Sequence, residues 1–210
     1  MPKFTEGDFL DGEGAAKLLA YIIQKIETAK QLGKDVAVQT LPASLTTPVA
    51  DAPTETAGWI AHGTLLELQE TIGLSPESTL KCNVQLTATD NSAIAYLIPA
   101  IYRKTETDTC ELVASFEKTQ LISNGWYTIA LSKMNDLILD AADTFYLVFL
   151  HNQQGTQLLG HAAPTVRVTK EIAWVSDNLG NISKAPSTLQ MARESLISFY
   201  GQVTGSRVFS

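Results

Sequence analysis

Three histidines are the side chains in this sequence that could bind a metal ion or carry a proton in a reaction. They are His62, His151 and His161, and no two of them have the spacing of a metal-binding motif such as HExxH. The sequence also contains no CxxC pair and no glycine-rich phosphate loop. Each histidine is therefore expected near the end of a strand, and the sequence predicts no catalytic residue, no bound metal and no cofactor.

Two clusters of carboxylate and amide side chains could bind calcium, which takes oxygen ligands from flexible loops. One cluster recurs at helical spacing and the other falls in a turn: Asp136, Asp140 and Asp143, and Asp177, Asn178 and Asn181. Neither matches an EF-hand loop, so we interpret the first as a hydrated surface and the second as a turn. Since no catalytic triad and no pair of acids set among aromatic residues stands out either, we expect a protein that is not an enzyme.

The two cysteines, Cys82 and Cys110, each lie in a run of alternating apolar and polar residues, in phase with the apolar positions. This pattern is typical of buried free thiols that pack as small apolar side chains. A disulfide between facing strands is the alternative, although a protein made in the cytoplasm would seldom rely on one.

The three tryptophans are the residues best suited to bind a sugar, because an indole ring can stack on the C–H face of a pyranose. Trp59, Trp126 and Trp174 each stand at or inside an expected strand, with tyrosines nearby. The alternative is that all three lie in the core, since tryptophan usually buries most of its area. We keep them as candidates for ligand stacking.

The elements that position these residues are mostly strands. Residues 80–87 alternate cleanly between apolar and polar side chains, which indicates a strand with one face in a core. Residues 145–150 are apolar throughout, so we expect a central strand buried on both faces. The other expected strands are 59–72, 93–102, 110–117, 126–132, 144–151, 165–175 and 196–203. Residues 134–142 and 188–194 could each form a single helical turn in a loop. Short strands separated by turns predict an antiparallel β-sandwich, with a jelly roll as the preferred topology.

An amphipathic helix is expected before the strands, at residues 11–33. Its apolar seam repeats at alternating spacings of four and three residues, as in a coiled coil. The residues of this seam are Ala15, Leu19, Ile22, Ile26 and Ala29. Leu19 followed by Ile22 favours a coiled coil of three or four helices over one of two. The seam could instead pack on the protein's own sheet, as most apolar stripes do.

The sequence divides into a tail at 1–10, a helical oligomerisation segment at 11–39, a linker or arm at 40–57 and a β-domain at 58–210. Three prolines spread among small polar residues define the linker. Residues 58–210 have the commonest size of a single domain. We therefore expect them to fold alone after proteolytic cleavage in the linker.

Charge and hydropathy exclude several kinds of partner. The formal net charge is −7, which disfavours nucleic acid and anionic membranes, because both require clustered lysine and arginine. No apolar run approaches the length of a membrane span. The N-terminus lacks the apolar core of a signal peptide, so we expect synthesis in the cytoplasm.

The N-terminal residues resemble the start of many bacteriophage fibre proteins. The run FLDGEG at 9–14 leads into LLAYIIQKI at 18–26, similar to the "LDxxGL" stretch and the LxxYIxxKI helix of those fibres. The strands GWYTIAL and FYLVFLHN are similar in style to those of fibre jelly rolls and carbohydrate-binding modules. The resemblance implies a homotrimer whose helical bundle attaches to the virion while its β-domain faces outward.

We therefore interpret the chain as a virion structural protein, a head or tail fibre or decoration subunit. Its expected partners are other virion proteins and a glycan on the host surface. The alternative is a carbohydrate-binding or adhesin module that acts through exposed aromatic residues. A polysaccharide-acting enzyme is the third hypothesis, and it lacks visible acids in a suitable setting.

Overall fold

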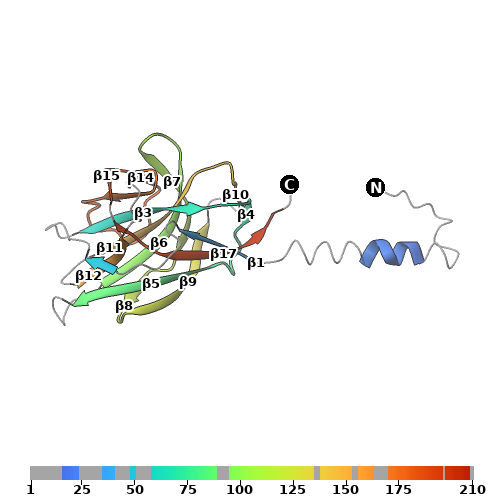
Figure 1. Cartoon of the computed structure of the whole chain (residues 1–210), viewed down its shortest axis with the longest axis horizontal. Helices are drawn as coiled ribbons and strands as arrows, with labels where there is room; N and C mark the ends of the chain where they lie inside the picture. The colour runs from blue at the N-terminus through green and yellow to red at the C-terminus, as the bar shows by residue number, and fades with distance from the viewer. Residues whose placement is uncertain are drawn as a thin grey trace.

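A computed structural model describes residues 16–23, 35–40, 48–50, 58–88, 95–134, 138–152, 156–162, 170–195 and 197–208. Residues 16–23 form a helix, and nearly all other regular structure is antiparallel strand. In Figure 1 the strands surround a common core, while the helix lies well apart from them. This confirms the prediction of a mainly β protein with an N-terminal helix.

Eight strands close into a barrel, because the pairing returns from the last strand to the first. In order around the ring they are β1 (Asp35–Thr40), β3 (Trp59–Glu67), β11 (Phe145–Asn152), β6 (Ala95–Lys104), β7 (Thr109–Phe116), β9 (Gly125–Met134), β5 (Thr79–Ala88) and β17 (Gly201–Arg207). Every pairing is antiparallel. The finer prediction, a jelly-roll sandwich, is not confirmed, since these pairings form a closed ring.

The interior of the barrel is filled by alternate residues of its strands. On β5, Leu80, Cys82 and Val84 point inward and are at most 1% exposed, while Lys81 points to solvent. On β11, the inward residues include Phe149, which is 1% exposed. The alternation in the sequence therefore corresponds directly to the two faces of the barrel wall.

A second core lies on the outer face of β3, β11, β6 and β7. Residues 173–194, here called the covering segment, pass over this face (Figure 1). The segment contains β13 (Ala173–Ser176), β14 (Thr188–Gln190) and β15 (Arg193–Glu194); β13 pairs with β3 and β14 pairs with β7. Tyr146, Val148 and Leu150 of β11 face this second core. The prediction of a central strand buried on both faces is thus confirmed for β11.

Trp174 is the central residue of the covering segment, and it is fully buried. Its indole lies directly over Gly63 of β3, where an added Cβ would come within 2.1 Å of the indole Cε2 atom. The ring also meets Tyr146 edge-on, with 5.9 Å between ring centroids. The covering segment can therefore approach β3 this closely only because residue 63 has no side chain.

The remaining strands are short. They are β2 (Pro48–Ala50), β4 (Ile72–Gly73), β8 (Thr119–Leu121), β10 (Ile138–Leu139), β12 (Thr156–Ala162) and β16 (Ile197–Ser198). β12 pairs with β2, β16 and the far end of β5, which makes a small second sheet.

The structure moves two boundaries that the sequence suggested. Residues 35–39, expected in the helical segment, form most of β1 and belong to the barrel, which therefore begins at Asp35 and not at residue 58. Residues 188–194, expected as a helical turn, contribute β14 and β15 instead. At residues 188–194 pairing with a distant strand overrides the local pattern, whereas in β1 the alternating residues Val36, Val38 and Thr40 already favour a strand.

Candidate functional site

The helix of residues 16–23 carries an apolar face that the barrel does not cover. Leu19, Ile22 and Ile23 are 58%, 42% and 47% exposed. The other seam residues, Ala15, Ile26 and Ala29, lie outside the described residues. No helix in the described ranges has the length and apolar character needed to cross a membrane. Within the described part of the helix, the seam is thus open to a partner.

Of the three tryptophans, Trp126 is the one that offers a ring to solvent. It is 49% exposed on the outer surface of β9, with the Tyr200 ring edge-on at 5.7 Å and the Lys81 Nζ atom 5.0 Å from its ring centroid. Trp59 and Trp174 are 3% and 0% exposed, and both belong to the second core. This corrects the expectation for Trp59 and Trp174, because a buried indole cannot stack on a ligand from solvent.

The two cysteines are free and lie on opposite sides of the barrel wall. Cys82 is in the interior core and Cys110 is in the second core. Burial raises the pKa of each thiol to about 12. Both therefore remain protonated and unreactive at neutral pH. Their burial as free thiols confirms the prediction from the sequence.

Two of the histidines form a buried pair, which the sequence did not predict. His62 of β3 and His151 of β11 are 2% and 1% exposed, and the His62 Nδ1 and His151 Nε2 atoms lie 2.8 Å apart in a hydrogen bond. The ring of Phe199 packs against both of them inside the barrel. Among the described residues, the Nδ1 atom of His151 has no hydrogen-bond partner. The third histidine, His161, is in β12, and its side chain lies outside the described ones.

The environment of His151 predicts that the protein is destabilised by mild acid. Burial, and then the charge of His62, lower the pKa of His151 well below its ordinary value. Below about pH 6.5, the unfolded chain binds a proton at His151 that the folded chain does not bind, so the free energy of unfolding falls as the pH falls, by up to roughly 1 kcal/mol per pH unit.

The variant His151→Gln should show a flatter dependence between about pH 7.5 and pH 5.5, a range above carboxylate titration. Urea unfolding of wild type and variant at a series of pH values measures the two slopes. Equal slopes would contradict the assignment of the acid sensitivity to His151.

The acidic clusters of the sequence are engaged in contacts within the protein. Asp143 pairs with Arg103 at 3.8 Å, Asp177 pairs with Arg193 at 3.2 Å, and Asp140 accepts a hydrogen bond from the Thr71 hydroxyl. Asp136 lies outside the described residues. In the described ranges, no group of three or more histidine, cysteine, aspartate or glutamate side chains is arranged to hold a metal ion.

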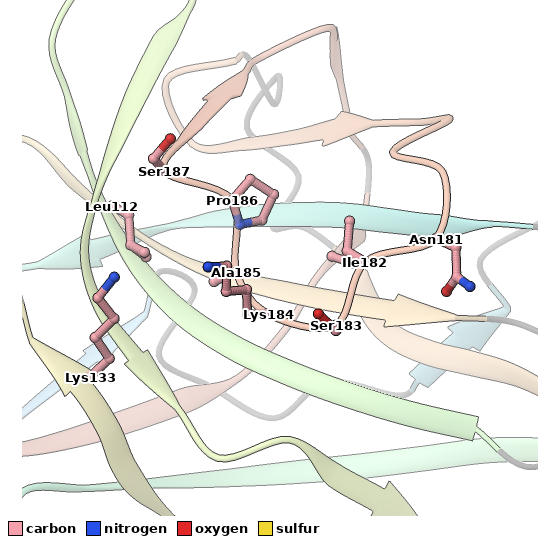
Figure 2. Close-up of a pocket in the computed structure, with 9 residues that line it drawn as sticks. All are labelled: Leu112, Lys133, Asn181, Ile182, Ser183, Lys184, Ala185, Pro186 and Ser187. Carbon is pink, nitrogen blue, oxygen red and sulfur yellow. The ribbon is translucent and has the colours of Figure 1, made fainter.

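A pocket of about 410 Å³ opens between the covering segment and the barrel wall (Figure 2). It is lined by residues 181–187, by Leu112 of β7 and by Lys133 of β9. Figure 2 shows the Lys133 side chain pointing from β9 toward the loop, and the Lys184 amino group on the side of the loop that faces Lys133. Sequence reasoning missed this pocket, since single lysines in separate segments form no motif. Asn181, assigned to a turn, is one of its lining residues.

The loop that forms the pocket is held at both ends by hydrogen bonds. Residues 179–180 exchange two backbone hydrogen bonds with Trp59, at 3.0 and 3.1 Å. At the other end, the backbone N–H of Leu112 and the hydroxyl of Tyr102 donate to the carbonyls of residues 186–187, at 2.9 and 2.7 Å. The pocket is therefore largely formed before any ligand arrives, as is usual for small-molecule sites.

The fold and these surfaces define an eight-stranded antiparallel barrel with an external covering segment and an open helical seam. Comparisons with protein-family models, with curated proteins and with solved structures found no match to this chain.

Proposed function

We propose that this chain is a non-enzymatic structural subunit of a virion, a fibre or decoration protein that assembles through its N-terminal helix and displays the β-barrel. The described strands close into a barrel, whereas the strand pattern and the resemblance to bacteriophage fibres favoured a jelly-roll sandwich. The proposed partners are two further copies of the chain, other virion proteins and a glycan on the host surface.

The observation that carries this proposal is the exposure of Leu19, Ile22 and Ile23 on a helix that stands apart from its own barrel. A helix of this length is only marginally stable in water unless its apolar face is packed. Burying each large apolar side chain stabilises by roughly 1.5–3 kcal/mol. Association of the seam with other copies of the chain supplies that packing, and the Leu19/Ile22 order favours more than two helices.

The experiment is a mass measurement on the full-length protein by light scattering coupled to size exclusion. Wild type is expected to be a trimer. The double variant Leu19→Asp/Ile22→Asp should dissociate, because charges in a dry seam lose their hydration. The control is Ala20→Asp, which adds one negative charge outside the seam and should stay trimeric, and the single variant Ile22→Asp, which adds the same charge inside the seam, should dissociate. If the wild-type protein were a monomer at micromolar concentration, the proposal would be contradicted.

A carbohydrate-binding module is the second candidate, and the exposed ring of Trp126 favours it. The two functions predict different effects of removing the helix. A structural subunit would lose its assembly, whereas a binding module would keep its affinity for sugar in the barrel alone.

A further inference from the structure

The pocket under the covering segment is lined by two lysines that, among the described residues, form no ion pair and no contact with an aromatic ring. Among the described lysines and arginines, those that form ion pairs with carboxylates are Arg103, Lys104, Lys170, Arg193 and Arg207. Lys81 and Lys118 lie over aromatic rings, and Lys17 of the helix also makes an interaction. Within the described residues, this leaves Lys133 and Lys184, and both line the same pocket.

Two unpaired ammonium groups around one pocket are unexpected in a chain whose formal net charge is −7. Carboxylates are abundant enough to neutralise them, as they neutralise five other described basic residues, yet no aspartate or glutamate lines this pocket. A lysine ammonium is a point charge with three donors, suited to a carboxylate, sulfate or phosphate oxygen. The pocket therefore has a positive local charge that an anionic ligand would neutralise.

The rest of the lining is suited to a small molecule with both hydroxyl groups and apolar C–H surface. Asn181, Ser183 and Ser187 provide donors and acceptors, while Leu112, Ile182 and Pro186 provide apolar contact. A volume of about 410 Å³ lies near the lower end of the range for small-ligand pockets. Because the loop is fixed at both ends, little ordering cost opposes binding.

We propose that this pocket binds an anionic saccharide, with its acidic group between the amino groups of Lys133 and Lys184. The hydroxyl groups of the sugar meet the serine and asparagine side chains of the loop, and one face of the ring lies against Leu112 and Pro186. The proposal does not depend on the helix or on the oligomeric state. It is therefore tested separately from the proposed structural role.

The experiment is titration of the isotope-labelled full-length protein, followed by NMR and calorimetry. The probes are glucuronate, glucose 6-phosphate and a sulfated glucose. Glucose is the control without a charge, and inorganic phosphate is the control without a sugar. The acidic sugars are expected to bind and to shift the backbone amides of residues 181–187 and of Leu112. Glucose and inorganic phosphate should each bind at least tenfold more weakly, since each supplies one half of the interaction. The preferred acidic sugar identifies the anionic group.

The location is tested with the double variant Lys133→Gln/Lys184→Gln. Loss of two charge-assisted hydrogen bonds should weaken binding roughly tenfold or more. The matched control, Lys118→Gln/Lys170→Gln, removes the same charge elsewhere and should bind as wild type does. Raising the salt concentration should weaken binding to wild type much more than to the lysine variant.

Three outcomes would overturn the proposal. The first is an absence of binding by all the acidic sugars at millimolar concentration. The second is equal affinity of the pocket variant and wild type. If Trp126→Ala also abolished binding, the sugar would lie at Trp126 and not in the pocket. The third is equal binding of inorganic phosphate and the acidic sugars, which would leave a simple anion site.

Discussion

A fragment of residues 58–210 is expected not to form the native barrel, whereas a fragment of residues 35–210 is expected to fold and to be monomeric. The two differ by β1 and the segment after it. β1 pairs with β17 from Asp35 to Gln39 and with β3 at its other end, so it closes the ring. Without it, the edge of β17 loses its partner at residues 202–206, and β3 loses its partner at residues 66–67, although residues 61–64 of β3 stay paired with β13. Such unpaired edges promote aggregation.

Removal of β1 also eliminates contacts that its own side chains make. Val38 is buried in the interior core. The Thr40 hydroxyl donates to the Phe199 carbonyl at 3.0 Å and accepts from the Gly201 N–H at 3.1 Å. Removing β1 therefore opens the core and leaves buried backbone groups unsatisfied, each at roughly 1–3 kcal/mol. This reverses the expectation that cleavage between residues 40 and 57 releases a stable domain.

Circular dichroism during heating and light scattering coupled to size exclusion distinguish the two fragments. The 35–210 fragment should unfold in one cooperative transition, because its barrel is complete. The 58–210 fragment should aggregate or melt without a sharp transition. If the shorter fragment were a monomer with the same melting temperature, β1 would not be needed for closure. If the longer fragment remained a trimer, the helix would not be the assembly element.

The variant Gly63→Ala is expected to lower the free energy of unfolding by about 3 kcal/mol or more, at the upper end for an overpacked core. The added methyl would lie 2.1 Å from the Trp174 Cε2 atom and 2.4 Å from its Nε1 atom. Relief requires movement of a large ring that is itself fully buried, or of the whole covering segment. Because dense interiors have few voids, neither movement is easy.

Urea unfolding measures this loss, and Gly58→Ala is the matched control. A Cβ at Gly58 meets its nearest atom, the Gly180 carbonyl oxygen, at 3.5 Å, which is an ordinary contact. The control should therefore change stability by less than about 1 kcal/mol. In the background of Trp174→Phe, whose ring is smaller, Gly63→Ala should cost clearly less. An equal cost in both backgrounds would show that the indole is not the source of the strain.

The local elements could be predicted from the sequence, since they depend on patterns within a few residues. Alternation through Leu80, Cys82 and Val84 correctly predicted a strand with one buried face. The apolar run at 145–150 correctly predicted a strand buried on both sides. The burial of both cysteines as free thiols followed from the same periodicity. The helix was also expected, and the structure describes it at residues 16–23.

The pairing of the strands and the covering of their faces could not be predicted from the sequence, because both depend on contacts between distant residues. Val36, Val38 and Thr40 alternate as in a strand, but no local pattern shows that this strand pairs with β17 across most of the chain. His62 and His151 meet because β3 and β11 pair in one register. Trp126 is exposed while Trp59 and Trp174 are buried, since the covering segment packs on one side of the barrel and not on the other. The same packing brings Lys184 to the pocket that Lys133 lines, and so creates a charge pattern that no stretch of sequence contains.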